Sequence, residues 1–244
     1  MWLSRFNHTR LKKMNIESKW IVGDFHIHSK FSKDSVQRPS TIFKLAQQRG
    51  LNCISITDHN SFEANSSDYN ERGMIWVKGV EIKTEIGDII GLFIEEPIKS
   101  DRFQTVTEEI KDQGGLVVLP HPFSHHKIKI GEIVEQVDLI EIFNGRCTKR
   151  QNERAKKLAM RLNKPMIGGS DAHFPWKIAS VKTIFRIPSF TRVGLKEGLL
   201  RSKKYFSIRN HLPLFSHICS IFCEKTKILL NIAKCCSDSP KTLT

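Results

Sequence analysis

Two histidines separated by one residue, His26 and His28, are the first feature of this chain that could support chemistry. The apolar run at 20–22 leads into them and predicts a β-strand over 20–28. Alternate side chains of a strand project from one face, so the two imidazoles would lie side by side. Imidazole nitrogens are common ligands of transition metals, and the pair therefore predicts half of a metal site.

The same arrangement, a strand that runs into a histidine or a carboxylate, recurs along the chain. Each such residue alone has an ordinary explanation, for example a turn residue for His121 between two prolines or a solvated charge for Glu81. Their recurrence at strand ends favours a shared metal centre. With Asp34 from the first loop there are eight candidates: His26, His28, Asp34, His59, Glu81, His121, Asp171 and His173.

The number and type of these donors predict more than one ion. A single tetrahedral zinc takes four ligands, whereas eight or nine donors fit two or three ions that share a bridging carboxylate. Glu81 is the natural bridge, because a carboxylate has two oxygens. Mixed nitrogen and oxygen donors suit Zn, Mn or Fe better than Ca or Mg, which prefer oxygen ligands.

Strand and helix patterns alternate throughout the part of the chain that carries these residues. We expect strands at 20–28, 51–57, 74–80, 89–94, 116–119, 139–143, 165–169 and 181–187. We expect helices at 41–49, 104–113, 130–136, 149–162 and 192–201. About seven strand and helix units in this order predict an α/β fold with a mainly parallel, closed sheet, in which the carboxyl ends of the strands converge on one mouth.

The net charge of +14 is concentrated in the two ends of the chain. Residues 1–19 hold five Lys or Arg and one acid, and residues 201–244 hold eight and two, which leaves +4 for the segment between them. Basic ends could help an anionic polymer to bind, but they are at least as consistent with solvated ends that aid solubility. Apolar positions among the lysines after residue 205 predict one or two amphipathic helices. We favour packing against the underside of the barrel over a helix that binds a membrane surface or a partner.

Composition sets further bounds. No run of about 18 apolar residues predicts a membrane span, and the first residues lack the apolar stretch of a secretory signal, so we expect a cytoplasmic protein. Six cysteines form no recognisable disulfide framework, and we interpret them as free thiols. The oligomeric state does not follow from the sequence.

Six motifs in order carry a resemblance to a known family. They are Asp24-x-His26-x-His28-Ser29, Thr57-Asp58-His59-Asn60, Gly79-Val80-Glu81, Leu119-Pro120-His121-Pro122, Ile140-Glu141-Ile142-Phe143-Asn144-Gly145 and Gly169-Ser170-Asp171-Ala172-His173. This set resembles the PHP family, named for polymerase and histidinol phosphatase. The match implies a domain at 20–206 with a distorted seven-stranded, (β/α)7 TIM-like barrel, flanked by a basic arm at 1–19 and a basic, partly helical tail at 207–244.

The resemblance also implies a trinuclear phosphoesterase site. His26, His28, Glu81 and Asp171 would hold one metal, and Asp34, His59 and His173 another. Glu81 and His121 would hold the remaining one, which some members complete with a histidine where this chain has Asn144.

In the expected mechanism a metal-bridging hydroxide attacks phosphorus in line, and Asp171 orients it. Arg146 is the first candidate for gripping the substrate phosphate, because its guanidinium offers a fork of donors. Lys33, Arg38, His125 and His126 are second candidates.

The predicted function is hydrolysis of phosphate mono- or diesters, with a nucleotide or an oligonucleotide end as the substrate favoured by the basic ends. Three alternatives stay open. The first is a histidinol-phosphate-type phosphatase that acts on a small phosphorylated molecule. The second is a metal-dependent amidohydrolase, which would leave His59 and His173 unexplained. The third is a non-catalytic nucleic-acid-binding module, against which the nearly complete ligand set speaks.

Overall fold

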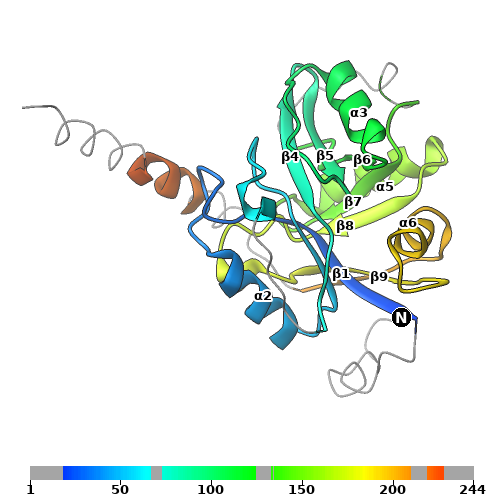
Figure 1. Ribbon diagram of the computed structural model, residues 1–244, viewed down its shortest axis with the longest axis horizontal. Coiled ribbons are helices and arrows are strands. Elements are labelled where there is room, and N and C mark those ends of the chain that lie inside the picture. The colour runs from blue at the N-terminus through cyan, green and yellow to red at the C-terminus, as the bar shows by residue number, and fades with distance from the viewer. Residues whose placement is uncertain (1–18, 67–72, 125–132, 134, 210–218, 228–244) are drawn as a thin grey trace, which may run out of the picture.

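The protein is described from a computed structural model that covers residues 19–66, 73–124, 133, 135–209 and 219–227 (Figure 1). Within these residues the strands form two five-stranded sheets. The α/β class predicted from the sequence is thus confirmed.

The first sheet is built around the strand that carries the paired histidines. β1 (Trp20–Ile27) pairs in parallel with β2 (Cys53–Ile56) and antiparallel with β9 (Val181–Arg186). The short β3 (Ile75–Trp76) extends the sheet beyond β2, and β10 (Tyr205–Ile208) extends it beyond β9.

The second sheet follows the order of the chain. β4 (Gly79–Thr84) and β5 (Gly87–Leu92) form an antiparallel hairpin, and β6 (Leu116–Leu119) is antiparallel to β5. β7 (Leu139–Asn144) and β8 (Met166–Gly169) then continue in parallel.

The expectation of a continuous, mainly parallel (β/α)7 barrel is not met in the described part of the chain, where no closed barrel is found. Half of the strand pairs are antiparallel, because the β4–β5 hairpin and the return of β9 and β10 along β1 reverse the chain without a crossover helix. Between the two sheets, the β-bridges found in the described residues are isolated ones, His59 to Glu81 and Ile27 to Ala172. Both bridges involve or adjoin candidate metal ligands.

Between residues 19 and 209, the described part of the chain has four α-helices that pack against the sheets (Figure 1). They are α2 (Pro39–Gln48), α3 (Phe103–Asp112), α5 (Lys149–Arg161) and α6 (Arg192–Arg201). The start of α5 is fixed by a capping box, in which the Thr148 side chain accepts a hydrogen bond from the backbone of Gln151 and the Gln151 side chain accepts one in return. Residues 219–227 are also helical.

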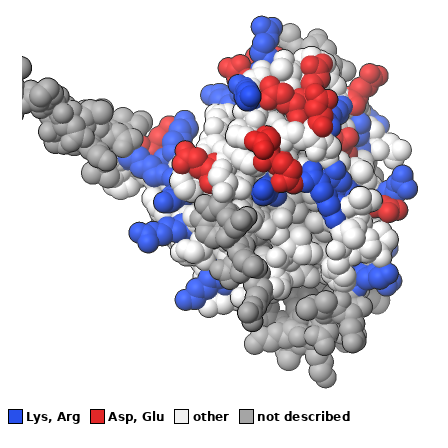
Figure 2. Space-filling model, in the orientation of Figure 1, with Lys and Arg blue, Asp and Glu red and all other residues white. Residues whose placement is uncertain are grey.

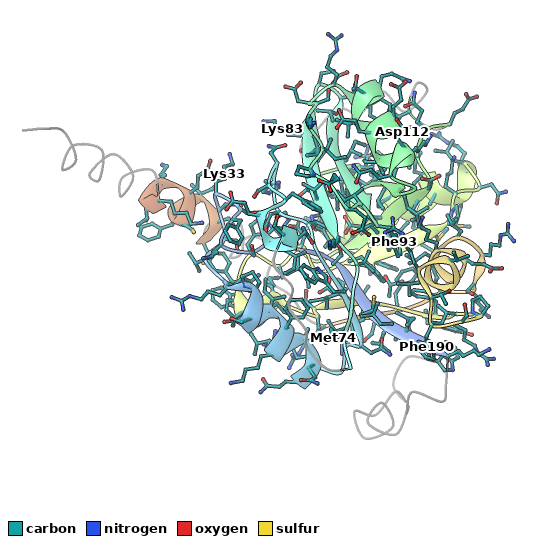
Figure 3. All side chains as sticks on the ribbon, viewed as in Figure 1. Lys33, Met74, Lys83, Phe93, Asp112 and Phe190 are labelled. Carbon is teal, nitrogen blue, oxygen red and sulfur yellow. The ribbon has the colours of Figure 1, made fainter. Side chains whose placement is uncertain are left out.

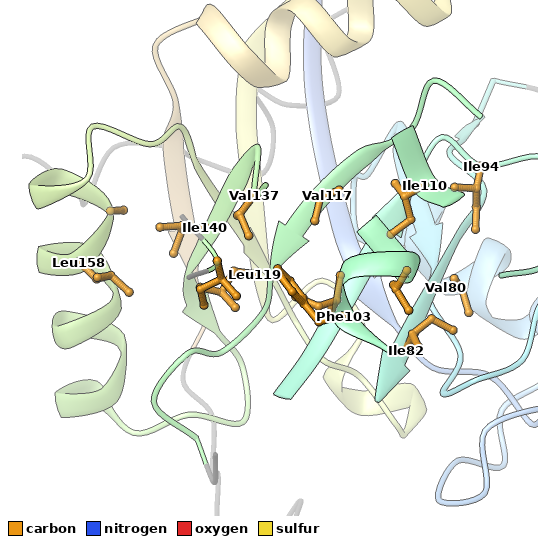
Figure 4. Close-up of a cluster of buried hydrophobic side chains, with 14 of the residues drawn as sticks. Val80, Ile82, Ile94, Phe103, Ile110, Val117, Leu119, Val137, Ile140 and Leu158 are labelled. Atoms are coloured by element: carbon orange, nitrogen blue, oxygen red, sulfur yellow. The ribbon is translucent and has the colours of Figure 1, made fainter. Parts of the chain in front are cut away.

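A buried apolar cluster ties the second sheet to its helices (Figure 4). Ile110 of α3 and Leu158 of α5 pack with strand residues such as Val117 and Ile140, and all four are almost fully buried. This packing fixes the strands whose ends carry the functional side chains.

Three details differ from the sequence prediction. The strand expected at 74–80 is divided into β3 and β4, so Glu81 is the third residue of β4 and does not follow a strand end. β10 lies where no strand was expected. The helix expected at 130–136 lies largely outside the described residues.

No helix in the described ranges combines the length and the apolar character that a membrane span requires.

Candidate metal centre

The candidate donors come together where the two sheets meet. β1 supplies His26, and His28 lies just beyond its end. His59, His121 and His173 follow β2, β6 and β8. The remaining donors are Glu81 in β4, Asp171 after β8 and Asp34 in the loop between β1 and α2.

The donor atoms nearest the paired histidines come from two carboxylates. The Nε2 atoms of His26 and His28 lie 3.1 Å apart, and each lies 3.3 Å from Oε2 of Glu81. Oδ1 of Asp171 lies 3.7 Å from the first nitrogen and 3.3 Å from the second. A tetrahedral ion with ligands at about 2.1 Å would separate its donors by about 3.4 Å. The two histidines together with either carboxylate therefore have the spacing of ligands of one such cation, and His26, His28 and Asp171 form one compact group.

The carboxylate of Glu81 is shared between two groups of donors. Its Oε2 faces His26 and His28 and lies 3.1 Å from Nδ1 of His59, while its Oε1 lies 2.9 Å from Nε2 of His121. The side chain is fully buried. One oxygen toward each group is the arrangement that a bridging ligand requires.

A third group surrounds His173. Its Nε2 lies 2.9 Å from Oδ2 of Asp34, and Oδ1 of the same carboxylate lies 3.9 Å from His59. Ring nitrogens of His28, His59 and His173 also lie within 4.8 Å of one another. The guanidinium of Arg146 enters this group, with Nη1 3.8 Å from Asp34 and 3.9 Å from Asp171.

Glu141 supports the histidine of the first strand. It is 2% exposed, its Oε1 lies 3.0 Å from Nδ1 of His26, and its Oε2 accepts a hydrogen bond from the backbone of His121. A carboxylate on the far nitrogen of a histidine fixes the ring and leaves the other nitrogen for a metal. Glu141 belongs to one of the six motifs but was not predicted as a site residue. A charged residue between Ile140 and Ile142 of a buried strand is the signal that could have singled it out.

Ser32 is the corresponding support for two more histidines, and it was not predicted. Its hydroxyl lies 3.1 Å from Nδ1 of His28, accepts a hydrogen bond from the backbone of His59 and donates one to Asp58 at 2.7 Å. Asp58, adjacent to His59, also accepts hydrogen bonds from the backbone and the hydroxyl of Ser29.

The side chain of Asn144 is engaged in hydrogen bonds within the protein. Its amide donates to Oε2 of Glu141 at 2.9 Å and to Oδ2 of Asp171 at 3.1 Å, and its oxygen accepts from the backbone of Arg146 at 2.8 Å. Asn144 thus lies beside the donors and connects three of the residues that surround them.

The backbone at the site is held in unusual conformations. Asp171 and His121 have φ of 50° and 26°, in the left-handed region that non-glycine residues rarely occupy. Gly169 lies so close to His26 that an added Cβ would be 2.4 Å from the Cβ of that histidine. Surrounding structure therefore dictates where these ligands point.

Opposite charges balance each other in the buried cluster. Burial disfavours an ionised Glu81, but the imidazoles of His26 and His59 outweigh this effect and hold the pKa of Glu81 well below its usual value. Burial likewise disfavours protonated His28 and His121, yet hydrogen bonds to Asp171 and Glu81 for the former, and to Glu81 for the latter, raise the pKa of each to about 9. The pKa of His173 falls to about 3 because of burial and the nearby His28 and Arg146.

Two of the second candidates for phosphate binding, Lys33 and Arg38, are not brought into the cluster. Lys33 is exposed and pairs with Glu224 at 2.7 Å, and Arg38 is exposed immediately before α2. His125 and His126 lie outside the described residues. Among the predicted phosphate ligands that the structure describes, Arg146 is the one that lies at the donors.

The fold and the site define an α/β protein with a buried cluster of histidines and carboxylates suited to several metal ions. A PHP-domain family model matches residues 24–131, and a PHP-associated model matches residues 149–203. The chain belongs to the PHP family, as the motifs predicted.

Two uncharacterized proteins of Methanocaldococcus jannaschii are similar in sequence. One is 38% identical over 138 residues, which are 50% of this chain and 81% of the relative. The other is 30% identical over 169 residues, which are 64% of this chain and 67% of the relative.

Several solved structures share the fold. A two-domain protein of Bacteroides vulgatus, described as containing a predicted PHP-like metal-dependent phosphoesterase, has a TM-score of 0.66 at 22% identity. The match covers 80% of this chain and 66% of that one, so this chain spans slightly less than two thirds of it. PsfC of Pseudomonas syringae has a TM-score of 0.65 at 16% identity, over 85% of this chain and 99% of that one. Endonuclease Q, bound to a 27-mer duplex with an abasic lesion at the active site, has a TM-score of 0.58 at 15% identity. That match covers 73% of this chain and 56% of the endonuclease chain.

Proposed function

We propose that this chain is a metal-dependent phosphoesterase that hydrolyses phosphate mono- or diesters. The observation that carries the proposal is the set of short separations, 3.1 to 3.7 Å, between the ring nitrogens of His26 and His28 and from these nitrogens to the carboxylates of Glu81 and Asp171, with Glu81 shared with a second group. Membership in the PHP family supports it.

The donor groups suggest which residues would hold the metals. His26, His28, Glu81 and Asp171 would hold one ion, and Glu81 with His121 a second. Asp34, His59 and His173 would hold a third. Divalent ions of the Zn, Mn or Fe type would supply Lewis-acid activation of water and of the phosphoryl group.

The chain's own residues would orient the substrate and the attacking water. Arg146 would bind a phosphoryl oxygen with its guanidinium, since its side chain is 12% exposed and its Nη1 is within 4 Å of both Asp34 and Asp171. Asp171 would orient the attacking water, while Asn144 holds the Oδ2 of this carboxylate by a hydrogen bond. Asn144 would thus position Asp171, whether or not it also contacts a metal.

A nucleotide or an oligonucleotide end is the substrate that we propose within this class. The basic ends of the sequence and the shared fold of endonuclease Q support it. On the face shown in Figure 2, acidic side chains gather over the region of α3 and its neighbouring strands. This distribution argues against a broad nucleic-acid-binding face there.

The amidohydrolase alternative is less consistent with the geometry. An amidohydrolase of the same fold class from Chromobacterium violaceum has a TM-score of 0.52 at 14% identity. His59 and His173, which that alternative left unexplained, both lie in the cluster, at 3.1 Å from Glu81 and 3.3 Å from Asp171 respectively.

We also propose residues 20–206 as the catalytic domain, with residues 207–244 as an additional segment. β10 runs two residues past this limit, so the additional segment begins within a strand of the first sheet.

The test is to count bound metals by elemental analysis and to assay hydrolysis of mononucleotides, histidinol phosphate and a 5′-phosphorylated oligonucleotide with Mn or Zn present. Asp171→Asn is expected to abolish turnover. Asp112→Asn is the matched control, because Asp112 is exposed at the end of α3 (Figure 3). A protein that binds no metal and cleaves none of these esters would overturn the proposal.

A further inference from the structure

The helix at residues 219–227 lies against the loop that carries Asp34 (Figure 1). Neither family model covers this helix. Its buried side chains Ser220 and Cys223 are spaced as neighbours on one helical face, and Ile221 and Phe222 are exposed. The helix therefore presents one face to the rest of the protein.

The ammonium group of Lys227 is bound by three backbone carbonyls of this loop. Its Nζ donates to the oxygens of Lys30 at 3.0 Å, Ser32 at 2.7 Å and Ser35 at 2.5 Å. A lysine has three N–H donors, so this contact uses all of them. Three convergent carbonyl oxygens repel one another without a cation between them, and the ammonium thus fixes the curvature of the loop.

The loop is held from two sides, by contacts within the domain and by contacts with the helix. Gln37 secures the base by donating to the carbonyls of His28 and Ala172. At the tip, Lys33 pairs with Glu224 of the helix at 2.7 Å (Figure 3). The Lys227 contacts span the segment between base and tip.

The residues held in this way contact three histidines of the metal centre. The Ser32 hydroxyl contacts His28 and the backbone of His59. The carboxylate of Asp34 contacts His173, and the hydroxyl of Ser35 donates to the carbonyl of the same histidine at 2.8 Å. A displacement of the loop would therefore move a candidate ligand and the support of two others.

The structure assigns to residues 219–227 the role of a C-terminal clamp, in which Lys227 is a positioning residue that holds Asp34 and Ser32 in place for the metal group around His59 and His173. This inference rests on the proposed function only in treating Asp34 as a ligand. If the clamp operates, metal affinity depends on a segment that neither family model covers.

The test compares Lys227→Ala with Lys225→Ala in the full chain. Lys225 is exposed on the same helix, so the control removes the same charge and the same number of atoms. We expect Lys227→Ala to weaken binding of one equivalent of Mn or Zn by about 10-fold or more, as loss of a supporting contact does at other metal sites. Amide hydrogen exchange of residues 29–36 should accelerate in this variant only.

Methylammonium provides a readout that a general loss of stability would not give. It should enter the three-carbonyl site in Lys227→Ala and restore metal binding, whereas it should not rescue Asp34→Asn. Glu224→Gln, which removes only the ion pair with Lys33, should weaken metal binding less than Lys227→Ala does. This variant takes the place of Lys227→Ala in the test if Lys227→Ala does not fold.

Equal metal affinity and equal exchange in Lys227→Ala and Lys225→Ala would overturn the clamp. If the unmutated protein binds metal but cleaves no phosphate ester, the proposed function fails while the clamp is still decided by these two measurements.

Discussion

Replacing Glu81 by glutamine is expected to destabilise the metal-free protein at about pH 7 by about 3–5 kcal/mol, the usual effect of removing one partner of a buried ion pair. Glu81 is fully buried and lies within 3.3 Å of a ring nitrogen on each of four histidines: His26, His28, His59 and His121. Glutamine keeps the shape but removes the charge that balances the protonated rings.

The pH dependence identifies the cause of this loss. The pKa values of His28 and His121 are raised to about 9 in the folded protein, above the ordinary value of 6.5. A raised histidine pKa stabilises the fold below pH 6.5, and this contribution is lost as the pH rises through 9. At about 1.4 kcal/mol per pKa unit, one such histidine contributes at most about 3 kcal/mol, and the two do not add because they share Glu81.

Urea unfolding in the presence of a chelator measures the effect. The difference in unfolding free energy between the unmutated protein and Glu81→Gln should be largest below about pH 6.5 and should shrink above about pH 9. Glu96→Gln, at an exposed position, should show no such difference. A Glu81→Gln penalty that is constant from acid to alkaline pH would refute the coupling between this carboxylate and protonated histidines.

Metal binding should release protons near neutral pH, because metal ligands must be deprotonated and the pKa values of His28 and His121 lie near 9; titration calorimetry that gives the same heat in buffers of different protonation enthalpy would contradict this. Arg146→Met should raise KM for a phosphate ester by about 10- to 100-fold with unchanged metal content, the loss expected for a charge-assisted hydrogen bond, and Arg146→Lys should recover part of it. If KM stays the same in Arg146→Met, this side chain does not bind the substrate. Gly169→Ala should destabilise the protein by about 1–3 kcal/mol in urea unfolding, because its Cβ would press against His26; an unchanged midpoint would show that the strand can shift at little cost.

Local patterns were sufficient to predict the composition of the donor cluster. The two-residue period of β1 placed His26 and His28 on one face, and their Nε2 atoms are 3.1 Å apart. His59, His121, Asp171 and His173 follow strands that were recognised from their apolar character. These predictions depended only on residues within a few positions of each ligand.

The features that sequence did not reveal depend on distant partners. The strand predicted at 74–80 is interrupted between Trp76 and Gly79, because β3 pairs with β2 whereas β4 pairs with β5. No local signal in the sequence separates the two segments. β10 is a mostly exposed edge strand, so it lacks the buried alternation that marks strands. The contact of Lys227 with a loop about 190 residues earlier likewise follows from the packed chain alone.

The cluster brings together more buried charge than a stable interior tolerates unless the charges are balanced. Burial disfavours ionised Glu81 and Asp171, but the imidazole of His26 helps to hold the pKa of each well below its usual value, and Arg146 lies within 4 Å of Asp171. Divalent ions would take over the same role, and the imidazoles would then lose their protons. Protons and metals would therefore compete for the same buried carboxylates and imidazoles.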